Sequence, residues 1–148
     1  MKKIEKKMQD FFTSEEKKES PLLKRIAERC EGLIYISETD EAISAFAGDK
    51  ADEINEADLR DIAGISPDAP VEEISLARFF DRLTTIQDWF GDREKENAKK
   101  FGELQQLLEE DLRDLKVFRF GSVRIDIIVA GTDANGQVAG IRTAAVET

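Results

Sequence analysis

The segment Asp133-Ala134-Asn135-Gly136 is the first place where residue types and spacing could support chemistry. Aspartate and asparagine at alternate positions, followed by glycine, are similar to the start of a calcium-binding loop. Such a loop needs further oxygen ligands and a glutamate at its twelfth position, which here is Ala144. The segment therefore favours a turn between two strands, in which the glycine can take a positive φ.

Histidine is absent and cysteine occurs once, as Cys30. Without histidine, Ser-His-Asp catalysis, Cys-His catalysis and His-ligated zinc are all excluded. A single cysteine allows no intrachain disulfide and no CxxC site, which suits a reducing compartment, and its place on an apolar helix face is typical of a buried side chain. Carboxylates are abundant, but no pair has a spacing typical of a hydrolase. We therefore expect no catalytic residue, no cofactor and no metal site of the chain's own.

Trp89 is the only tryptophan, and it lies between Gln87-Asp88 and Phe90-Gly91. Two placements are open. Trp89 can belong to the core, or Phe90 can take the core-facing position and leave Trp89 half exposed. Exposed tryptophans are favoured anchors in protein interfaces.

The C-terminal residue Thr148 combines a hydroxyl with an α-carboxylate, whose ordinary pKa of about 3.3–3.7 keeps it ionised at neutral pH. Hard oxygen donors at a protruding end could complete the coordination shell of a Mg²⁺ held by another protein. The alternative is a frayed tail with no role.

The charge of the chain is strongly acidic and unevenly distributed. The 148 residues include 22 basic and 32 acidic ones, a net charge of −10. Residues 31–73 hold 13 acidic residues against Lys50 and Arg60, a net of −11. This argues against direct nucleic-acid binding, which requires Lys and Arg to neutralise phosphates. It suits a basic partner, although a solvated acidic face that only aids solubility would look the same.

The first half of the chain predicts two helices and two strands in alternation, after an N-terminal segment of different character. Residues 1–20 are rich in Lys and Glu and suggest a mobile charged arm or an extra helix. Ser20 and Pro21 open the first helix, and Gly32 ends it. The remaining expectations are a strand over 33–36, an acidic turn over 37–41, no assignment for 42–54, a capped helix over 55–64 and a strand over 71–74.

The second half predicts helices followed by strands. A short helix carries Leu76, Phe79, Phe80 and Leu83, and Thr84 and Gln87 have the spacing of a capping box that starts another helix. A long amphipathic helix follows, with an apolar stripe of Ala98, Phe101, Leu104, Leu108, Leu112 and Leu115. Strands are expected over 117–120, 123–129 and 138–146. This order predicts an α+β domain with a mostly antiparallel sheet of four to five strands.

No apolar run of 18 residues is present, and the start of the chain lacks the apolar stretch of a signal peptide. We therefore expect no membrane association and a cytoplasmic location.

Three separated motifs resemble the nuclease A inhibitor family. They are Leu33-Ile34-Tyr35-Ile36-Ser37-Glu38-Thr39-Asp40, Gln87-Asp88-Trp89-Phe90 and the ending Val138-Ala139-Gly140-Ile141-Arg142-Thr143-Ala144-Ala145-Val146-Glu147-Thr148. The segments 67–71 and 79–80 are also similar. The resemblance covers residues 21–148, which we expect to form a single domain, and is weakest over 41–55.

The resemblance implies a three-layer α/β/α sandwich that inhibits a sugar-non-specific, metal-dependent nuclease of the ββα-metal class. It implies three partner-binding residues: Glu38, Trp89 and Thr148, with Thr148 at the catalytic metal of the nuclease. The expected function is therefore stoichiometric inhibition of a basic nuclease by a chain that is a monomer before complex formation and is not an enzyme. The alternative is an acidic protein-interaction module whose basic partner is not a nuclease.

Overall fold

The structure is a computed structural model that describes residues 20–148. The arm or extra helix expected over residues 1–20 lies outside the described residues, except for Ser20. In chain order the elements are α2 (Pro21–Cys30), β1 (Ile34–Ile36), β2 (Asp40–Ala42), β3 (Ser44–Lys50), α3 (Glu56–Ala63), β4 (Val71–Ile74), α4 (Leu76–Thr84), α5 (Asp92–Asp111), β5 (Arg113–Phe120), β6 (Arg124–Thr132) and β7 (Gln137–Val146).

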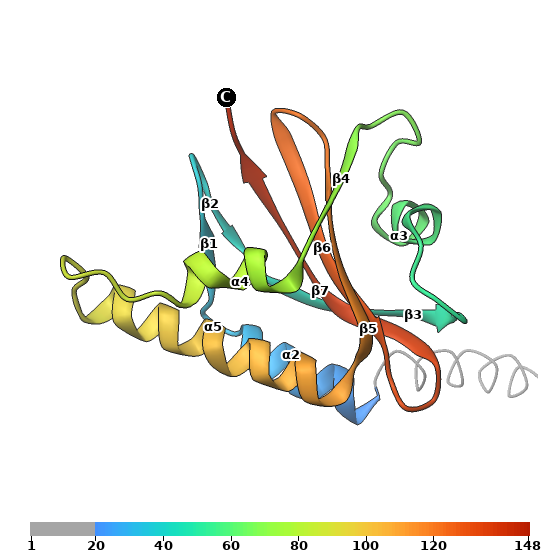
Figure 1. Ribbon diagram of the computed structural model, residues 1–148, viewed down its shortest axis with the longest axis horizontal. Helices are drawn as coiled ribbons and strands as arrows, with labels where there is room; N and C mark the ends of the chain where they lie inside the picture. Colours follow the sequence, from blue (N-terminus) through green and yellow to red (C-terminus); the bar gives the residue numbers. More distant parts are fainter. Residues whose placement is uncertain (1–19) are drawn as a thin grey trace, which may run out of the picture.

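The described chain has an α+β fold built on a five-stranded sheet in the order β3-β7-β6-β5-β4, with antiparallel neighbours throughout. A separate antiparallel pair, β1 and β2, lies beside the C-terminal end of β7 (Figure 1). The expected fold class and antiparallel sheet are confirmed.

Two apolar clusters lie on opposite faces of the sheet because successive strand residues point to opposite sides. The larger cluster joins α2, α4 and α5 to residues such as Val117, Ile127 and Ile141. The smaller joins the region of α3 to residues such as Phe118 and Ile128. Figure 1 shows α2, α4 and α5 together on one side and α3 on the other. Among residues 20–148, the second face carries only this eight-residue helix, and a three-layer sandwich stays a prediction.

The long β6–β7 hairpin sets the position of the C terminus. Pairing runs without a break from Thr132↔Val138 to Arg124↔Val146. The turn between the strands is the predicted one: Gly136 has a φ of 80°, and Asp133 Oδ1 accepts hydrogen bonds from the amides of Asn135 and Gln137. Because β7 is paired up to Val146, the chain end leaves the sheet from an ordered strand.

The prediction that a helix starts at Thr84 is wrong. Thr84 is the last residue of α4, and its Oγ1 donates a hydrogen bond to the carbonyl oxygen of Phe80, 2.9 Å away. The hydroxyl is thus used to bond back into the preceding turn. The next helix, α5, begins at Asp92, where Glu94 Oε1 accepts the amide of Gly91 at 3.0 Å. The intervening residues form the connection that carries Trp89.

The long helix also ends earlier than its apolar stripe predicts. It stops at Asp111, and Leu115 lies in β5. Asp114 has a φ of 55° and sits in a register shift between Arg113 and Lys116, which redirects the chain. The apolar spacing continued across this break because Leu112, just after the helix, and the partly buried Leu115 pack against the same cluster.

Strands β2 and β3 lie where the sequence predicted a turn or gave no assignment. The edge strand β3 contains Ala45, Ala47 and Gly48, which have weak strand preference. Its pairing with β7, such as Phe46↔Gly140, forms the strand instead. Long-range pairing therefore outweighs local propensity here.

Gly140 is required by the close approach of β6. A Cβ at this position would lie 1.9 Å from the carbonyl oxygen of Val129 and 3.0 Å from the Cα of Ala130. Gly140→Ala should lower the free energy of unfolding by about 1–3 kcal/mol or more, because backbone atoms must move. Gly102→Ala is the matched control: its Cβ would meet nothing within 4 Å inside α5, and it should raise stability by about 0.5–1 kcal/mol. Urea unfolding measures both, and equal effects would contradict this account.

Candidate functional site

The side chain of Glu38 and the C-terminal residue Thr148 lie in direct contact. Glu38 Oε2 accepts hydrogen bonds from the backbone amide of Thr148 at 3.0 Å and from its hydroxyl at 2.8 Å. Both residues are exposed. Two of the three predicted site residues, 110 positions apart in sequence, thus form one oxygen-rich group at the surface.

The turn between β1 and β2 holds Glu38 in this place. Ser37 Oγ accepts the amide of Val146 at 3.0 Å, and the amide of Glu38 donates to the carbonyl oxygen of Val146 at 3.3 Å. Farther along, Thr143 Oγ1 donates to the carbonyl oxygen of Ala42 at 2.9 Å. The turn is therefore attached along the last residues of β7, and it moves with the strand that carries the chain end.

The penultimate residue, Glu147, is held from the side of β7 that faces away from the β1–β2 turn. The amide of Glu147 donates to the carbonyl oxygen of Val123 at 2.9 Å. Its carboxylate accepts hydrogen bonds from Arg119 Nη2, with both oxygens 2.8 Å away. The last residues of the chain are thus hydrogen-bonded to the turn and to the sheet, as expected for a strand that runs almost to the chain end.

Hydrogen bonding lowers the pKa of Glu38 below its ordinary value of 4.5. The hydroxyl of Thr148 is the main cause, its backbone amide is the second, and a small desolvation effect opposes them. Hydrogen bonds to the ionised form of a carboxyl favour that form. The group is therefore a carboxylate at neutral pH, next to the α-carboxylate of the chain end.

Trp89 is 74% exposed, so its placement in the core is wrong. It lies in the segment between α4 and α5, and its ring packs edge to face against Phe90 with 4.7 Å between centroids. Phe90 is the less exposed of the two, as expected. Figure 1 shows this segment at the N-terminal end of α5, on the same side of the molecule as the β1–β2 hairpin. The structure records no contact between Trp89 and Glu38 or Thr148 among residues 20–148.

The shallow pocket around the chain end contains residues that the sequence did not single out. Its lining consists of Ile36, Ser37, Glu38, Arg82, Val146, Glu147 and Thr148. Arg82 Nη2 lies 3.3 Å from the hydroxyl of Tyr35, to which it donates. Ile36 is an exposed apolar residue, as are Ile86 and Val123. Alternation along β1, with Tyr35 buried, is the signal that could have identified Ile36 as exposed.

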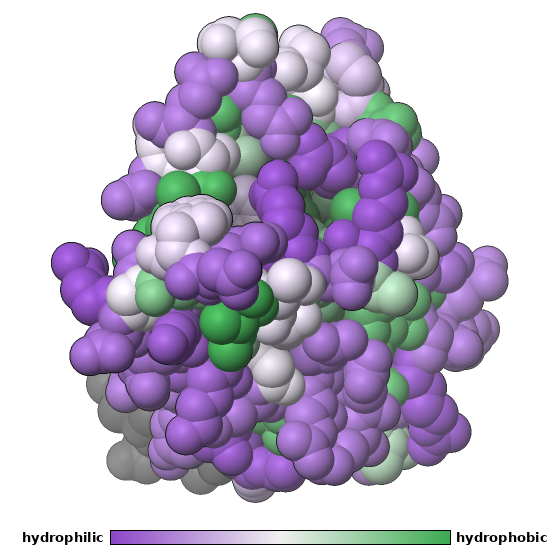
Figure 2. Space-filling model, turned by 60° about the vertical axis from the view of Figure 1, so that its left-hand side comes forward, coloured by the Kyte–Doolittle hydropathy of each residue, from purple (hydrophilic) through white to green (hydrophobic). Residues whose placement is uncertain are grey.

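The surface on this side is mainly hydrophilic and is interrupted by separate hydrophobic patches. Figure 2 shows it with the left-hand side of Figure 1 turned forward. Protein interfaces usually combine a few apolar anchor residues near their centre with a polar rim.

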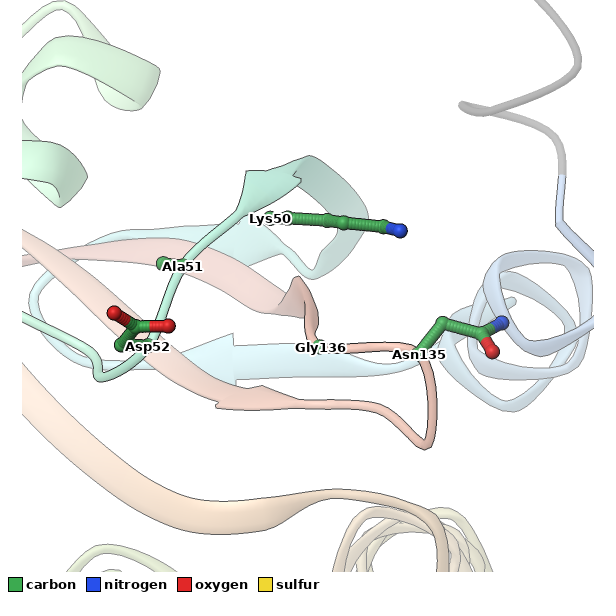
Figure 3. Close-up of a pocket in the computed structure, with 5 residues that line it drawn as sticks. All are labelled: Lys50, Ala51, Asp52, Asn135 and Gly136. Carbon is green, nitrogen blue, oxygen red and sulfur yellow. The ribbon is translucent and has the colours of Figure 1, made fainter.

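A second shallow pocket, lined by Lys50, Ala51, Asp52, Asn135 and Gly136, lies at the β6–β7 turn. Figure 3 shows the side chains of Lys50 and Asn135 extending the same way, while that of Asp52 lies apart. Ala51 donates its amide to Gly136, so the pocket borders a backbone junction. The described part of the chain contains no group of three or more Cys, Asp or Glu side chains placed to hold a metal ion.

Cys30 is buried on α2, as predicted. Burial raises the pKa of its thiol to about 12. Because the thiolate is the nucleophilic form, this cysteine is unreactive near neutral pH.

A family model described as nuclease A inhibitor-like protein matches residues 20–148, nearly the whole chain. The chain belongs to the nuclease A inhibitor-like family. No match was found among curated proteins. The resemblance of the three sequence motifs is thereby confirmed at the level of the family.

As a nuclease A inhibitor-like protein, the chain is assigned by its family to a nuclease inhibitor role with a nuclease partner. The match begins at residue 20, close to the start of α2. Within residues 20–148, no helix combines the length and apolar composition needed to cross a membrane.

Removing the hydroxyl of Thr148 should raise the pKa of Glu38 toward 4.5, because that hydroxyl is the main cause of the shift. Carbon-13 NMR titration of the Glu38 carboxyl in Thr148→Ala measures the change. Ser66→Ala is the control, since it removes a hydroxyl, bonded to the amide of Asp68, in the loop after α3. Because the pKa of Glu38 is lower in the folded than in the unfolded protein, its contact with Thr148 stabilises the fold at pH values above the unfolded-state pKa. This contribution is lost as the pH falls through the folded-state pKa. An unchanged pKa in Thr148→Ala would contradict the contact.

Proposed function

We propose that this protein is a stoichiometric inhibitor of a divalent-metal-dependent, sugar-non-specific nuclease of the ββα-metal class. It blocks the active site by presenting Thr148 to the catalytic metal of the partner. The observation that carries the proposal is the exposed contact between Glu38 and Thr148 at the end of an ordered strand. The family supports the inhibitor role.

The chemistry of this group fits a metal nuclease. Mg²⁺ prefers oxygen ligands and is usually held by few protein groups together with substrate phosphates. Thr148 offers an α-carboxylate and a hydroxyl, and Glu38 adds a second carboxylate beside them. The hydroxyl donates a hydrogen bond to Glu38, which leaves the lone pairs of the hydroxyl oxygen available. Negative oxygens at this position take the place of phosphate oxygens, so the inhibitor competes with nucleic acid.

The acidic segment 31–73 would accelerate encounter with the partner. A nuclease that attracts DNA presents a positive field, and an acidic surface is steered by the same field. The segment contains Glu38 and the β1–β2 hairpin, so part of its charge lies at the proposed contact. Steering of this kind weakens as ionic strength rises.

Trp89 would be a second anchor of the interface. A large, 74% exposed aromatic side chain loses much apolar surface when a partner covers it. With Glu38 and Thr148 it completes the partner-binding set of Glu38, Trp89 and Thr148. The chain itself would carry out no catalysis and hold no cofactor or metal. It would be a cytoplasmic monomer until it meets the nuclease.

Titration of nuclease A, with Mg²⁺ and plasmid DNA, tests the main claim. We expect DNA cleavage to fall to zero at an equivalence point near one inhibitor per nuclease. Deletion of Thr148, or addition of residues after it, should weaken inhibition by about 2–4 kcal/mol, the range of an interface hot spot. Ser66→Ala, which removes a hydroxyl in the loop after α3, is the control for a lost hydroxyl. Undiminished inhibition by both altered termini would overturn the active-site mechanism. Binding that depends only on salt and on residues 31–73 would indicate a general acidic interaction module.

Trp89→Ala should weaken inhibition by about 2–4 kcal/mol without lowering the melting temperature, because the side chain is exposed in the unbound protein. Isothermal titration calorimetry and thermal unfolding measure the two effects separately. Val71→Ala, which shortens another exposed apolar side chain on β4, is the matched control and should affect neither. A large loss of stability in Trp89→Ala would show a structural role instead.

A further inference from the structure

We propose that Arg119 is a positioning residue that holds the C terminus in its inhibitory place through an ion pair with Glu147. The inference rests on the proposed function, since it assigns a role in presenting Thr148. Arg119 lies on β5 and is not itself part of the exposed group formed by Glu38 and Thr148.

The ion pair between Arg119 and Glu147 is short and charge-assisted. Arg119 Nη2 lies 2.8 Å from both Oε1 and Oε2 of Glu147. Arg119 Nε lies 3.7 Å from Glu72 Oε1 on the neighbouring strand β4. The guanidinium is therefore held between two carboxylates, one from an edge strand and one from the chain end.

Burial makes this interaction stronger than an ordinary surface pair. The side chain of Arg119 is only 17% exposed, whereas Glu147 is 48% exposed. Burial opposes the charged form, but the hydrogen bonds and charge of Glu147, with smaller effects of Tyr35 and Glu72, outweigh it and raise the pKa of Arg119. The pair is thus better shielded from salt and water than two fully exposed charges.

The fold by itself has no need of a charge at this position. On the same face of β5, two residues earlier, Val117 is fully buried, and the cross-strand neighbour of Arg119 is the buried Ile127. An apolar residue would continue this cluster, because the side chain at this position is only 17% exposed. The guanidinium of Arg119 instead forms the contact with Glu147.

The last three residues are held alternately from two sides of β7. The amide of Val146 donates to Ser37 Oγ, that of Glu147 to the carbonyl oxygen of Val123, and that of Thr148 to Glu38 Oε2. The β1–β2 turn supplies the first and third contacts. Arg119 and Val123 supply the restraint from the side of β5 and β6. Chain ends fray unless they are tied down in this way.

Charge repulsion makes the cation necessary. Glu38, Glu147 and the α-carboxylate of Thr148 lie at the same end of the sheet, with Glu72 on the far side of Arg119. Without Arg119, these like charges would repel one another and drive the terminus into solvent. A partner would then have to order the freed residues itself, which weakens binding.

The first test uses the protein without a nuclease, so it does not depend on the proposed function. In Arg119→Met, we expect the heteronuclear ¹⁵N NOE of the Glu147 and Thr148 amides to fall toward the values of a disordered terminus. Arg25→Met is the matched control. It removes an Arg25–Asp111 pair of the same 2.8 Å length between α2 and α5, away from the C terminus (Figure 1). An unchanged NOE at Thr148 would overturn the inference.

A second variant keeps this test valid if Arg119→Met fails to fold. Glu147→Gln removes the charge of the half-exposed partner and leaves Arg119 in the sheet. It should lower the same NOE values, while Arg119→Lys, which retains the charge, should restore part of the order lost in Arg119→Met. Unchanged NOE values in Glu147→Gln would count against the inference as strongly as unchanged values in Arg119→Met.

The final test is a double-mutant cycle on inhibition of nuclease A. Arg119→Met should raise the inhibition constant at least about tenfold in the full chain, because two terminal residues lose their order. In a chain that lacks Thr148, the same substitution should change the inhibition constant little. Equal effects in both backgrounds would overturn the positioning role. If deletion of Thr148 alone has no effect, the proposed function fails, and the NOE measurements decide the role of Arg119 separately.

Discussion

The antiparallel pairing of β6 with β7 is the constraint on which the rest of the structure depends. It runs from Thr132↔Val138 at the turn to Arg124↔Val146 at the far end. On its other edge, β7 pairs with β3 and is bonded to the β1–β2 turn. A C-terminal residue usually has few restraints. Here it follows directly from a strand that is bonded on both sides, so its position is determined by the sheet.

Charge and order are coupled at this end of the sheet. The chain carries a net −10, and acidic groups would normally keep one another apart. Hydrogen bonds to Glu38 and the guanidinium of Arg119 instead hold carboxylates close together. These groups are ordered before any partner arrives, so little conformational entropy remains to be lost on binding. Under the proposed function, the same surface that disfavours nucleic acid would suit a protein that binds nucleic acid.

The exposed tryptophan follows from a helix boundary. Thr84 Oγ1 bonds back to Phe80 and ends α4, while the amide of Gly91 is capped by Glu94 at the start of α5. The seven residues between these helices have no core of their own, and Phe90 is the more covered of the two adjacent aromatic residues. Trp89 is therefore left at the surface, where only a partner can cover it.

The sequence by itself determined the α+β class, the capped helices and the C-terminal hairpin, because these depend on local periodicity and turn residues. It named Glu38, Trp89 and Thr148 as candidates through the resemblance of their motifs to the family. Only the tertiary structure decided the strand at Ser44–Lys50 and the helix end at Asp111, since pairing with β7 and a left-handed Asp114 outweigh local preference. It also brought Glu38 to Thr148 and Arg119 to Glu147. Contacts between residues so far apart in sequence leave no periodic signal, because they exist only once the strands have paired.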